Sequence, residues 1–409
     1  MTTKPMQGIR VVEVAQYTFT PSAGAILADW GADVIKVEHA VTGDAQRGLQ
    51  IGVGGVRSGA FQPLMEHPNR GKRSVGLALE TKEGRTALSA LVKEADVFLT
   101  NFLPSARRKL QIDVDDIRGT NPTIIYARGS ALGPRGSEAE VGGFDGNVFW
   151  TRGSGAAGAT PVDSPRMVHM PAPAFGDSLG GMALAGAISA ALFARLRSGE
   201  TSIVDVSLLG LAVWANGLSV ANGIITGEFI AAPPLDGPPN NPVNPLIGDF
   251  PTGDGRWITL TMMQPGRYWA EVCSILGREE LVQDPRFATA ESLIAHANEA
   301  GKELSATFRT RSLAHWAEAF RTFSGQWAVG QTPLELARDP QVLDNEYVVD
   351  VIDADGKVQK LASSPAQFDE TAQSSRRAPT FAEHTDEILL ESGYDMDRLI
   401  QAKLEGGIA

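Results

Sequence analysis

Short runs of β-branched residues alternate with helical segments through the first half of the chain. Two such runs, IRVVEVA at 9–15 and ADVIKVE at 32–38, enclose a segment, SAGAILADWG, that has the pattern of a helix ended by Gly31. Because β–α–β units place their strands parallel in one sheet, this alternation predicts an α/β domain. It continues around further β-branched runs at 72–79, 96–102, 123–130 and 201–209.

The composition changes at 228–250, where the sequence EFIAAPPLDGPPNNPVNPLIGDF is dense in Pro, Asn and Gly, as is typical of a linker or loop. A short strand, GRWITLTMM, and a mostly helical segment follow, and the tail then returns to strand, loop and a final helix. A large α/β domain interrupted by a small α+β domain is therefore predicted. The expected ranges are 1–225 for the N-terminal part of the large domain, 226–335 for the small domain with its linkers, and 336–409 for the C-terminal part that returns to the large domain.

Charge and composition restrict the partners. Of 409 residues, 43% are hydrophobic and 21% charged, and the formal net charge of −12 leaves no overall basic field for nucleic acid or an anionic membrane. The lone Cys273 excludes an internal disulfide and fits a reducing cytoplasm. The N-terminus has no apolar signal core, and the longest apolar run, 181–194, is too short to span a bilayer. These features predict a cytoplasmic protein with no nucleic acid and no membrane among its partners.

Several common sites are missing from the sequence. The first strand–helix turn, QYTFTPSAG, lacks the GxGxxG pattern of a dinucleotide site, and the glycine cluster at 52–59 precedes no clear helix. The sequence contains no Walker loop or HExxH pattern, and its six histidines show no ligand spacing, so no metal site is expected. What remains is a carboxylate, Asp177, and scattered basic residues on loops after strands, where open α/β sheets bind ligands.

Asp177 lies between an apolar lead-in and a glycine-rich start to an apolar helix, in the stretch PAPAFGDSLGGMALAGAISAALFARLRSGE at 171–200. A carboxylate at this place has two interpretations. In the first it caps the helix by accepting hydrogen bonds from the first free backbone N–H groups. In the second it reacts with a group that approaches closely between the small residues. The two interpretations are compatible.

A set of stretches occurs in one order along the chain: RVVEVAQYTFTPSAGAILADWGADVIKVEH, NRGKRSVGLAL, ADVFLTNFLP, NPTIIYARGSALGPRG, GGFD, GDSLGG and VDVSLL. In order and spacing they resemble the class III CoA-transferases, the CaiB/BaiF family that includes formyl-CoA transferase and the α-methylacyl-CoA racemases. The resemblance covers most of 9–209 and continues weakly into the tail. It implies a large Rossmann-like domain with a parallel sheet, built from both chain ends, a smaller domain, and two subunits interlocked as a homodimer.

In family members that transfer CoA, the nucleophile is an Asp followed by a glycine-rich turn, and Asp177 matches it. The resemblance implies that Asp177 attacks an acyl-CoA thioester, giving a mixed anhydride and then an aspartyl-CoA thioester, from which an acceptor carboxylic acid takes the CoA. The substrates are then an acyl-CoA and a carboxylic acid, with no tightly bound cofactor. Gly180 and Gly181 would let backbone N–H groups approach the oxyanion or let the CoA arm pass, and the helix N-terminus would keep Asp177 ionised at neutral pH.

The resemblance also implies a set of CoA-binding residues. Leu103 departs from the family's usual NFRP or NFGP sequence. The matching positions are Gln16 near the thioester, Asn101 and Phe102 beside the pantetheine, and Lys36, Asn69, Lys72, Arg73 and Lys109 around the nucleotide and its phosphates.

The racemase branch of the family needs a second acid/base, a His in a GHD sequence. The corresponding stretch here is GGFD, in which Phe144 stands in place of the His and Asp145 follows. Phenylalanine cannot transfer a proton, and His169 is the one other candidate near Asp177 in the sequence. A transferase is therefore expected, with a 2-methylacyl-CoA racemase and a non-catalytic acyl-CoA-binding relative as alternatives. The stretches FDGNVFW and VHMPAPAF suggest an aromatic and apolar pocket wall.

Overall fold

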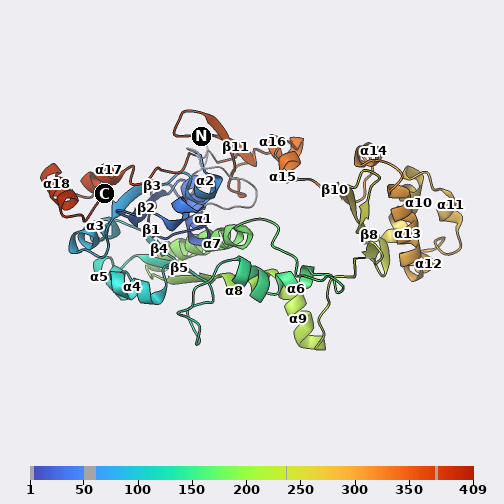
Figure 1. Ribbon diagram of the computed structural model, residues 1–409, viewed down its shortest axis with the longest axis horizontal. Coiled ribbons are helices and arrows are strands. Elements are labelled where there is room, and N and C mark those ends of the chain that lie inside the picture. Colours follow the sequence, from blue (N-terminus) through green and yellow to red (C-terminus); the bar gives the residue numbers. More distant parts are fainter. Residues whose placement is uncertain (1–3, 50–60, 236, 374–375) are drawn as a thin grey trace. The chain divides into compact units, whose positions relative to one another are not determined.

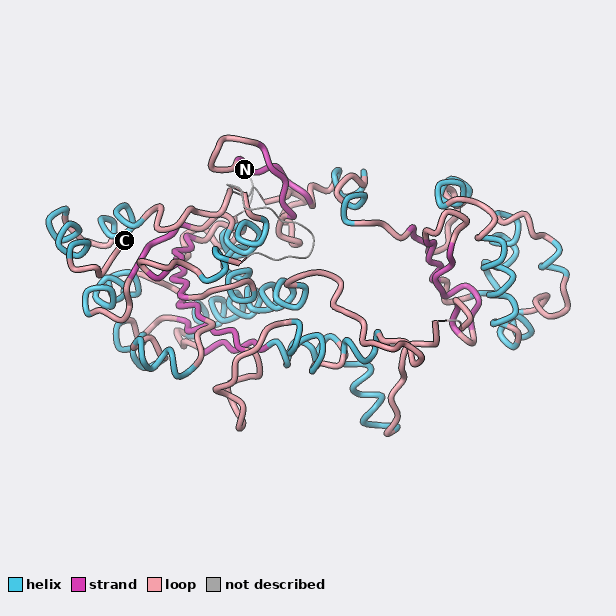
Figure 2. Tube along the Cα trace, in the orientation of Figure 1, coloured by secondary structure: helices cyan, strands magenta, loops and turns pink. Residues whose placement is uncertain are grey.

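The computed structural model describes residues 4–49, 61–235, 237–373 and 376–409, and the glycine cluster at 52–59 lies outside these ranges. The chain divides into two units (Figures 1 and 2), of which one combines both chain ends and the other is inserted between them. Unit 1 comprises Met1–Thr160, Pro165–Ala232 and Pro340–Ala409, and unit 2 comprises Pro161–Ser164 and Pro233–Asp339.

A parallel sheet lies at the centre of unit 1, with the strand order β3-β2-β1-β4-β5-β6. This confirms the α/β fold expected from the alternation of strands and helices. The order is that of a doubly wound fold, in which ligands bind outside the carboxyl ends of the strands. The six strands all come from the N-terminal part of the chain: β1 Arg10–Val14, β2 Asp33–His39, β3 Arg73–Leu77, β4 Val97–Thr100, β5 Ile125–Ser130 and β6 Ile203–Ser207.

Helices cover both faces of this sheet. Because successive residues of a strand point to opposite faces, Val11 is buried in a core shared with α1 and α7, and Val12 in a core shared with α3 and α5. Gly31, with a φ of +102°, follows the last turn of α1 and ends the helix where the sequence predicts. The helices of this part are α1 Phe19–Asp29, α2 Pro63–Asn69, α3 Lys82–Lys93, α4 Pro104–Leu110, α5 Val114–Thr120, α6 Gly155–Ala159, α7 Phe175–Ser198, α8 Leu208–Ala215 and α9 Gly217–Thr226, with short 3₁₀ and π segments at Ala45–Gly48 and Gly146–Arg152.

The C-terminal part of the chain completes the second of these cores. Ile388 of α17 and Leu399 of α18 are buried with Leu77 of β3, and Leu77 also forms an antiparallel bridge with Ile408. Both chain ends therefore build unit 1, the C-terminal end mainly through helices. The elements of this part are α16 Pro340–Asp344, β11 Val348–Ile352, β12 Val358–Ala362, α17 Thr385–Glu391 and α18 Met396–Leu404.

Unit 2 has an antiparallel sheet with the strand order β10-β9-β8-β7 and a set of helices. Its core is aromatic: the rings of Phe250 and Phe308 lie with centroids 5.3 Å apart, and Phe320 packs on Phe308. Unit 2 is thus the small α+β domain that the sequence predicts. Its elements are β7 Asn240–Asn241, β8 Asn244–Pro251, β9 Trp257–Thr261, β10 Trp327–Val329, α10 Pro265–Ile275, α11 Glu280–Gln283, α12 Ala290–Ala295, α13 Ala297–Phe308, α14 Leu313–Ala319 and α15 Pro333–Leu336.

The helix that carries Asp177 is longer than the apolar run inside it. α7 has 24 residues, and within the described part of the chain it is by length and composition a candidate to cross a membrane. The expectation that this segment is too short for a bilayer, drawn from 181–194 alone, was wrong. α7 buries Leu184 and Ile188 against the sheet, and it exposes Phe193 and Leu196.

Two glycines let α7 lie close against α1. A Cβ atom added to Gly181 would lie 2.4 Å from Cβ of Ser22 and 2.9 Å from the carbonyl oxygen of Phe19. A Cβ atom added to Gly180 would lie 2.5 Å from Cε2 of Phe19. Since these separations are well inside van der Waals contact, only glycine at both positions permits this approach of the two helices.

We expect Gly181→Ala to lower the free energy of unfolding by about 1–3 kcal/mol, because the added methyl group overpacks the contact between α1 and α7. Gly186→Ala is the matched control on the same helix, where an added Cβ meets no atom within 4 Å. Alanine there favours the helix by up to about 1 kcal/mol. Urea unfolding measures both variants, and equal stability would contradict the packing role of Gly181.

Candidate active site

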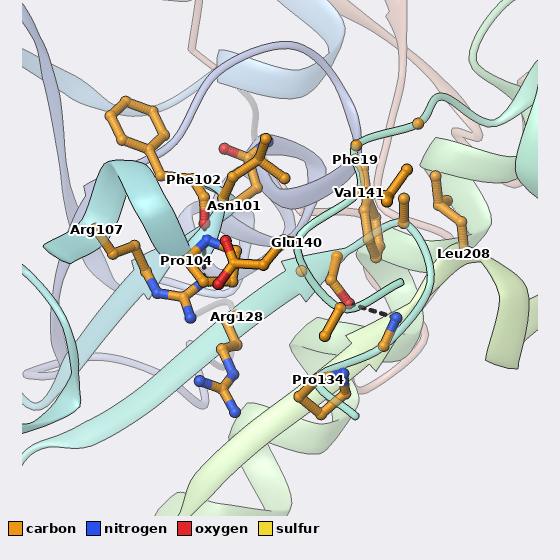
Figure 3. A pocket seen from close by; sticks show the side chains of 18 of the residues that line it. Phe19, Asn101, Phe102, Pro104, Arg107, Arg128, Pro134, Glu140, Val141 and Leu208 are labelled. Atoms are coloured by element: carbon orange, nitrogen blue, oxygen red, sulfur yellow. Dashed lines mark hydrogen bonds between the residues drawn. The ribbon is translucent and has the colours of Figure 1, made fainter. Parts of the chain in front are cut away.

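A pocket of about 640 Å³ opens at the carboxyl edge of the parallel sheet. Its lining includes Tyr17 after β1, Asn101 after β4, Ser130 at the end of β5, and Asp177 in the first turn of α7. Loops far apart in the sequence meet here because the carboxyl ends of parallel strands share one edge. Figure 3 shows Arg107 and Arg128 on one side of the view and Phe19 and Leu208 on the other.

Asp177 lies inside α7 and does not cap it. The cap position is taken by Ala174, in a left-handed conformation with a φ of 59°, so the capping interpretation was wrong. The residue is 8% exposed, and its carboxylate receives no side-chain or backbone hydrogen bond within the described ranges. Burial, together with the charge of Asp145, raises the pKa of Asp177 to about 7. The expectation that the helix N-terminus keeps Asp177 fully ionised at neutral pH was therefore wrong.

Asp145 is the charged neighbour of Asp177. Burial raises the pKa of Asp145, although the backbone N–H groups of Asp177, Gly146 and Gly176 donate hydrogen bonds to its carboxylate. Its Oδ2 atom is buried and has no hydrogen-bond partner among the residues described. The start of α7 therefore contacts the carboxylate of Asp145, which stands 32 positions before Asp177 in the sequence. The local sequence pattern around Asp177 does not indicate this contact.

The other predicted pocket residues divide into two groups. Phe144 lines the pocket beside Asp145 and is 59% exposed. His169 is exposed and does not line the pocket. Gly180 and Gly181 are buried against α1, and their expected part near a reacting oxyanion stays a prediction.

Asn101 holds the loop after β1 at the pocket. Its Oδ1 atom accepts from the backbone N–H of Gln16 at 3.1 Å, and its Nδ2 atom donates to the Gln16 carbonyl oxygen at 2.6 Å. Phe102, next along the chain, lines the same pocket. The structure therefore places Gln16 in contact with Asn101, although Gln16 is not among the residues that line the pocket, and the contact of these residues with CoA stays a prediction.

Lys36 and Lys72 lie fully buried below that loop. Lys72 Nζ lies 2.7 Å from Glu13 Oε2 and donates to Asn69 Oδ1 at 3.0 Å, while Lys36 Nζ lies 2.7 Å from Asp44 Oδ2. Burial lowers the pKa of Lys72 to about 7, whereas for Lys36 the carboxylates outweigh burial and raise the pKa to about 12. Both ammonium groups are engaged inside the protein, and their contact with CoA stays a prediction.

The remaining basic residues predicted for CoA lie outside this pocket. Arg73 forms ion pairs with Asp33 at 2.7 Å and with Glu387 and Glu391 of α17, and Lys109 is exposed on α4. Neither residue lines the pocket at the carboxyl edge.

Sequence reasoning missed the arginines that do line the pocket. Two of them stand directly before Lys109 in NFLPSARRKL, and the third lies on β5, so the signal was present in stretches already singled out. Each is paired with a carboxylate: Arg107 with Asp113, Arg108 with Glu140, and Arg128 with Asp205.

Comparison with known proteins gives one family. The model for CoA-transferase family III matches residues 6–385. The chain is 28% identical over 403 residues to (R)-2-hydroxy-4-methylpentanoate CoA-transferase of Clostridioides difficile, covering 96% of this chain and 97% of that protein. It is 32% identical over 402 residues to succinate–glutarate CoA-transferase of Agrobacterium fabrum, covering 95% of each. The solved structure of a CaiB/BaiF family protein from Brucella suis superposes with a TM-score of 0.81 at 26% identity, over 96% of this chain and all of that one.

A doubly wound sheet with a pocket and a buried carboxylate at its carboxyl edge places this chain among the α/β proteins that bind a ligand at that edge. The chain belongs to CoA-transferase family III, and it is a transferase that acts on CoA thioesters.

The raised pKa of Asp177 predicts how stability depends on pH. The ordinary pKa of an aspartic acid is 3.8, and the pKa of Asp177 in the folded protein is about 7. At pH values between the two, the folded protein holds a proton that the unfolded chain has lost. Asp177 therefore lowers the free energy of unfolding as the pH rises through this window. At about 1.4 kcal/mol per pKa unit, Asp177→Asn is expected to raise the free energy of unfolding by up to about 4 kcal/mol at pH 8 and by little at pH 4.

Urea unfolding at both pH values measures this effect. Asp344→Asn, which changes an exposed carboxylate, is the control and should alter stability by less than about 0.5 kcal/mol at either pH. A gain for Asp177→Asn that is equal at pH 4 and pH 8 would show that burial of its charge is not the cause.

Proposed function

We propose that this protein transfers CoA from an acyl-CoA to a carboxylic acid, with Asp177 as the nucleophile. The observation that carries the proposal is the state of the Asp177 carboxylate: it is buried in the pocket, beside a second carboxylate, and within the described chain it accepts no hydrogen bond. A carboxylate that is poorly solvated and weakly stabilised is reactive toward an electrophile. The family supplies the electrophile, the carbonyl carbon of a CoA thioester.

The proposed reaction has two pairs of steps. An Asp177 carboxylate oxygen forms a bond to the thioester carbonyl carbon, the C–S bond breaks, and CoA leaves as a thiolate, which gives a mixed anhydride. The thiolate then attacks the Asp177 carbonyl carbon and releases the donor acid as its carboxylate, leaving an aspartyl-CoA thioester. The acceptor carboxylate repeats these steps in reverse and leaves with CoA. No net proton is gained or lost, and each step forms one acyl bond as it breaks another.

Racemisation is a weaker candidate because it needs a second proton carrier. Phe144 stands where the racemase branch carries a His, and it lines the pocket without a transferable proton. His169 is exposed and outside the lining. The pocket described here therefore favours acyl exchange over removal of an α-proton.

We further propose that Asn101 and Phe102 contact the pantetheine arm, since both line the pocket that contains Asp177. We also propose a cytoplasmic location, supported by the single Cys273. Burial raises the pKa of this thiol to about 12 and leaves it unsuited to disulfide chemistry.

A second copy of the chain is proposed to cover the apolar surface of α7–α9. Leu196 on α7, Trp214 on α8, and Leu218 and Ile225 on α9 are exposed by 86%, 85%, 91% and 82%. Large apolar side chains on three consecutive helices are typical of an interface rather than of a surface in water. A homodimer, the assembly that the family resemblance implies, would remove this surface from water.

Removal of the nucleophile tests the reaction. A panel of acyl-CoAs, each with acceptor acids, is incubated with the protein, and new thioesters are detected by mass spectrometry. We expect Asp177→Asn to lower the rate by at least about a thousandfold, because no anhydride can form. Hydroxylamine added with an acyl-CoA should modify Asp177, located by peptide mass mapping. Asp344→Asn is the control and should keep full activity.

Full activity of Asp177→Asn would overturn the proposal. If the unsubstituted protein turns over no pair of substrates but binds acyl-CoA, and Asp177→Asn binds equally well, it is a non-catalytic acyl-CoA-binding member of the family. Deuterium uptake at the α-carbon of a 2-methylacyl-CoA without an acceptor acid would instead identify a racemase.

The proposed assembly is tested by sedimentation. We expect a dimer at all practical dilutions, because interlocked subunits cannot separate without partial unfolding. Leu218→Asp places a charge in the proposed interface and should reduce the amount of folded dimer. Leu404→Asp, at an exposed position of α18 outside α7–α9, should leave it unchanged. A compact, active monomer of the unsubstituted protein would contradict the interlocked arrangement.

A further inference from the structure

Tyr17, the first pocket residue after β1, has an unusual backbone. Its φ of +65° lies in the left-handed region, which bulky residues rarely adopt. Such strain persists where the surrounding structure holds it in place, and it is concentrated at functional sites. Here the backbone is fixed on both sides, by Asn101 at Gln16 and by Asp44, whose Oδ1 accepts from the Tyr17 N–H at 3.2 Å.

The group that holds Tyr17 is itself fixed by buried charge. Asp44 is 1% exposed and pairs with Lys36, and Lys36 also donates to the carbonyl oxygen of Ala15 at 3.0 Å. The same Asp44 Oδ1 accepts from the backbone N–H of Gln46 at 2.9 Å. The buried ion pair therefore holds the loop from both ends, and the position of the Tyr17 ring follows from it.

The ring of Tyr17 meets the ring of Phe144 edge to face, with centroids 5.4 Å apart and planes at 87°. Both rings line the pocket that contains Asp177. Phe144 directly precedes Asp145, which binds the start of α7, so this aromatic wall (Tyr17 and Phe144) stands beside the reacting carboxylate. Phe144 nevertheless remains 59% exposed, which is apolar surface that an apolar ligand would cover.

Among the described residues that line the pocket, no unpaired basic side chain is available to the far carboxylate of a dicarboxylic acyl group. The basic residues among its described lining are Arg107, Arg108 and Arg128, and each is already paired with a carboxylate of the protein. Phe19 borders the start of α7, since its ring lies 2.5 Å from where a Cβ of Gly180 would stand, and Figure 3 shows it across the view from Arg107 and Arg128. Burial of an unpaired carboxylate against aromatic rings is strongly unfavourable.

We propose that Tyr17 and Phe144 are the acyl-specificity residues of this site, and that they select uncharged apolar acyl groups, above all those that carry an aromatic ring, against dicarboxylic ones. An aromatic acyl group gains edge-to-face contact with rings that are already in place, whereas a dicarboxylic one must bury a charge against them. The inference rests on the proposed transfer through Asp177 and adds the chemical class of the acid.

Self-exchange tests the proposal without knowledge of the natural acid pair. 3-Phenylpropanoyl-CoA is incubated with carboxyl-labelled 3-phenylpropanoate, and succinyl-CoA with labelled succinate, and the label entering each thioester is measured by mass spectrometry. For the unsubstituted protein we expect kcat/KM to be at least about tenfold higher for the phenylpropanoyl pair. Phe144→Ala should lower that value by about tenfold and should leave the succinyl value unchanged or raise it, because a charge no longer has to be buried against the ring.

Two further variants distinguish the loss of a ring contact with the acyl group from general damage to the protein. Tyr17→Phe keeps the ring and should keep the preference, and Leu404→Ala, at an exposed residue of α18, should change neither rate. A preference for succinyl exchange in the unsubstituted protein would overturn the inference, as would an equal loss of both rates in Phe144→Ala. Absence of exchange with either pair and with every acyl-CoA of the wider panel would overturn the proposed function itself, and the inference with it.

Discussion

The contact between α1 and α7 determines where the reactive part of unit 1 lies. α1 follows β1 and packs on the sheet through its own apolar residues, and α7 packs both on the sheet and on α1. Gly180 and Gly181 make the approach close, and both stand within about a turn of Asp177. A well-packed interior transmits even small displacements, so a side chain larger than glycine at either position would move the start of the helix and its carboxylate.

Charge is used in two different ways around this edge of the sheet. Lys36 and Asp44 are buried as a pair, which adds little to stability but defines one arrangement of the loop after β1. Asp177 instead has a second carboxylate, Asp145, as its charged neighbour, and its pKa rises accordingly. Paired charges below the loop provide rigidity, while the unpaired carboxylate in the pocket retains its reactivity.

Much of the fold followed from local pattern, whereas the electrostatics of the site did not. The alternation of β-branched runs and helices predicted the parallel sheet, and Gly31 marked the end of α1 correctly. The capping interpretation of Asp177 was wrong because α7 begins earlier than its glycine-rich turn suggests. The pKa of Asp177 and the pairing of Lys36 depend on residues that only the folded sheet brings together, and spacing along the chain contains no measure of that proximity.

The return of the C-terminal end to unit 1 has a consequence for how the chain is made. Leu77 of β3 shares its core with Ile388 and Leu399, and Trp30 donates a hydrogen bond to Ser364, 334 positions later. At about 5–20 residues per second, a ribosome adds the residues between Leu77 and Ile388 in roughly 15–60 s. During that time one apolar face of the nascent sheet is covered by α3 and α5 but lacks α17 and α18. Unit 2, whose aromatic core lies within 246–323, can close as soon as it emerges. The incomplete core thus exposes, during synthesis, apolar surface that the folded protein hides and that chaperones recognise.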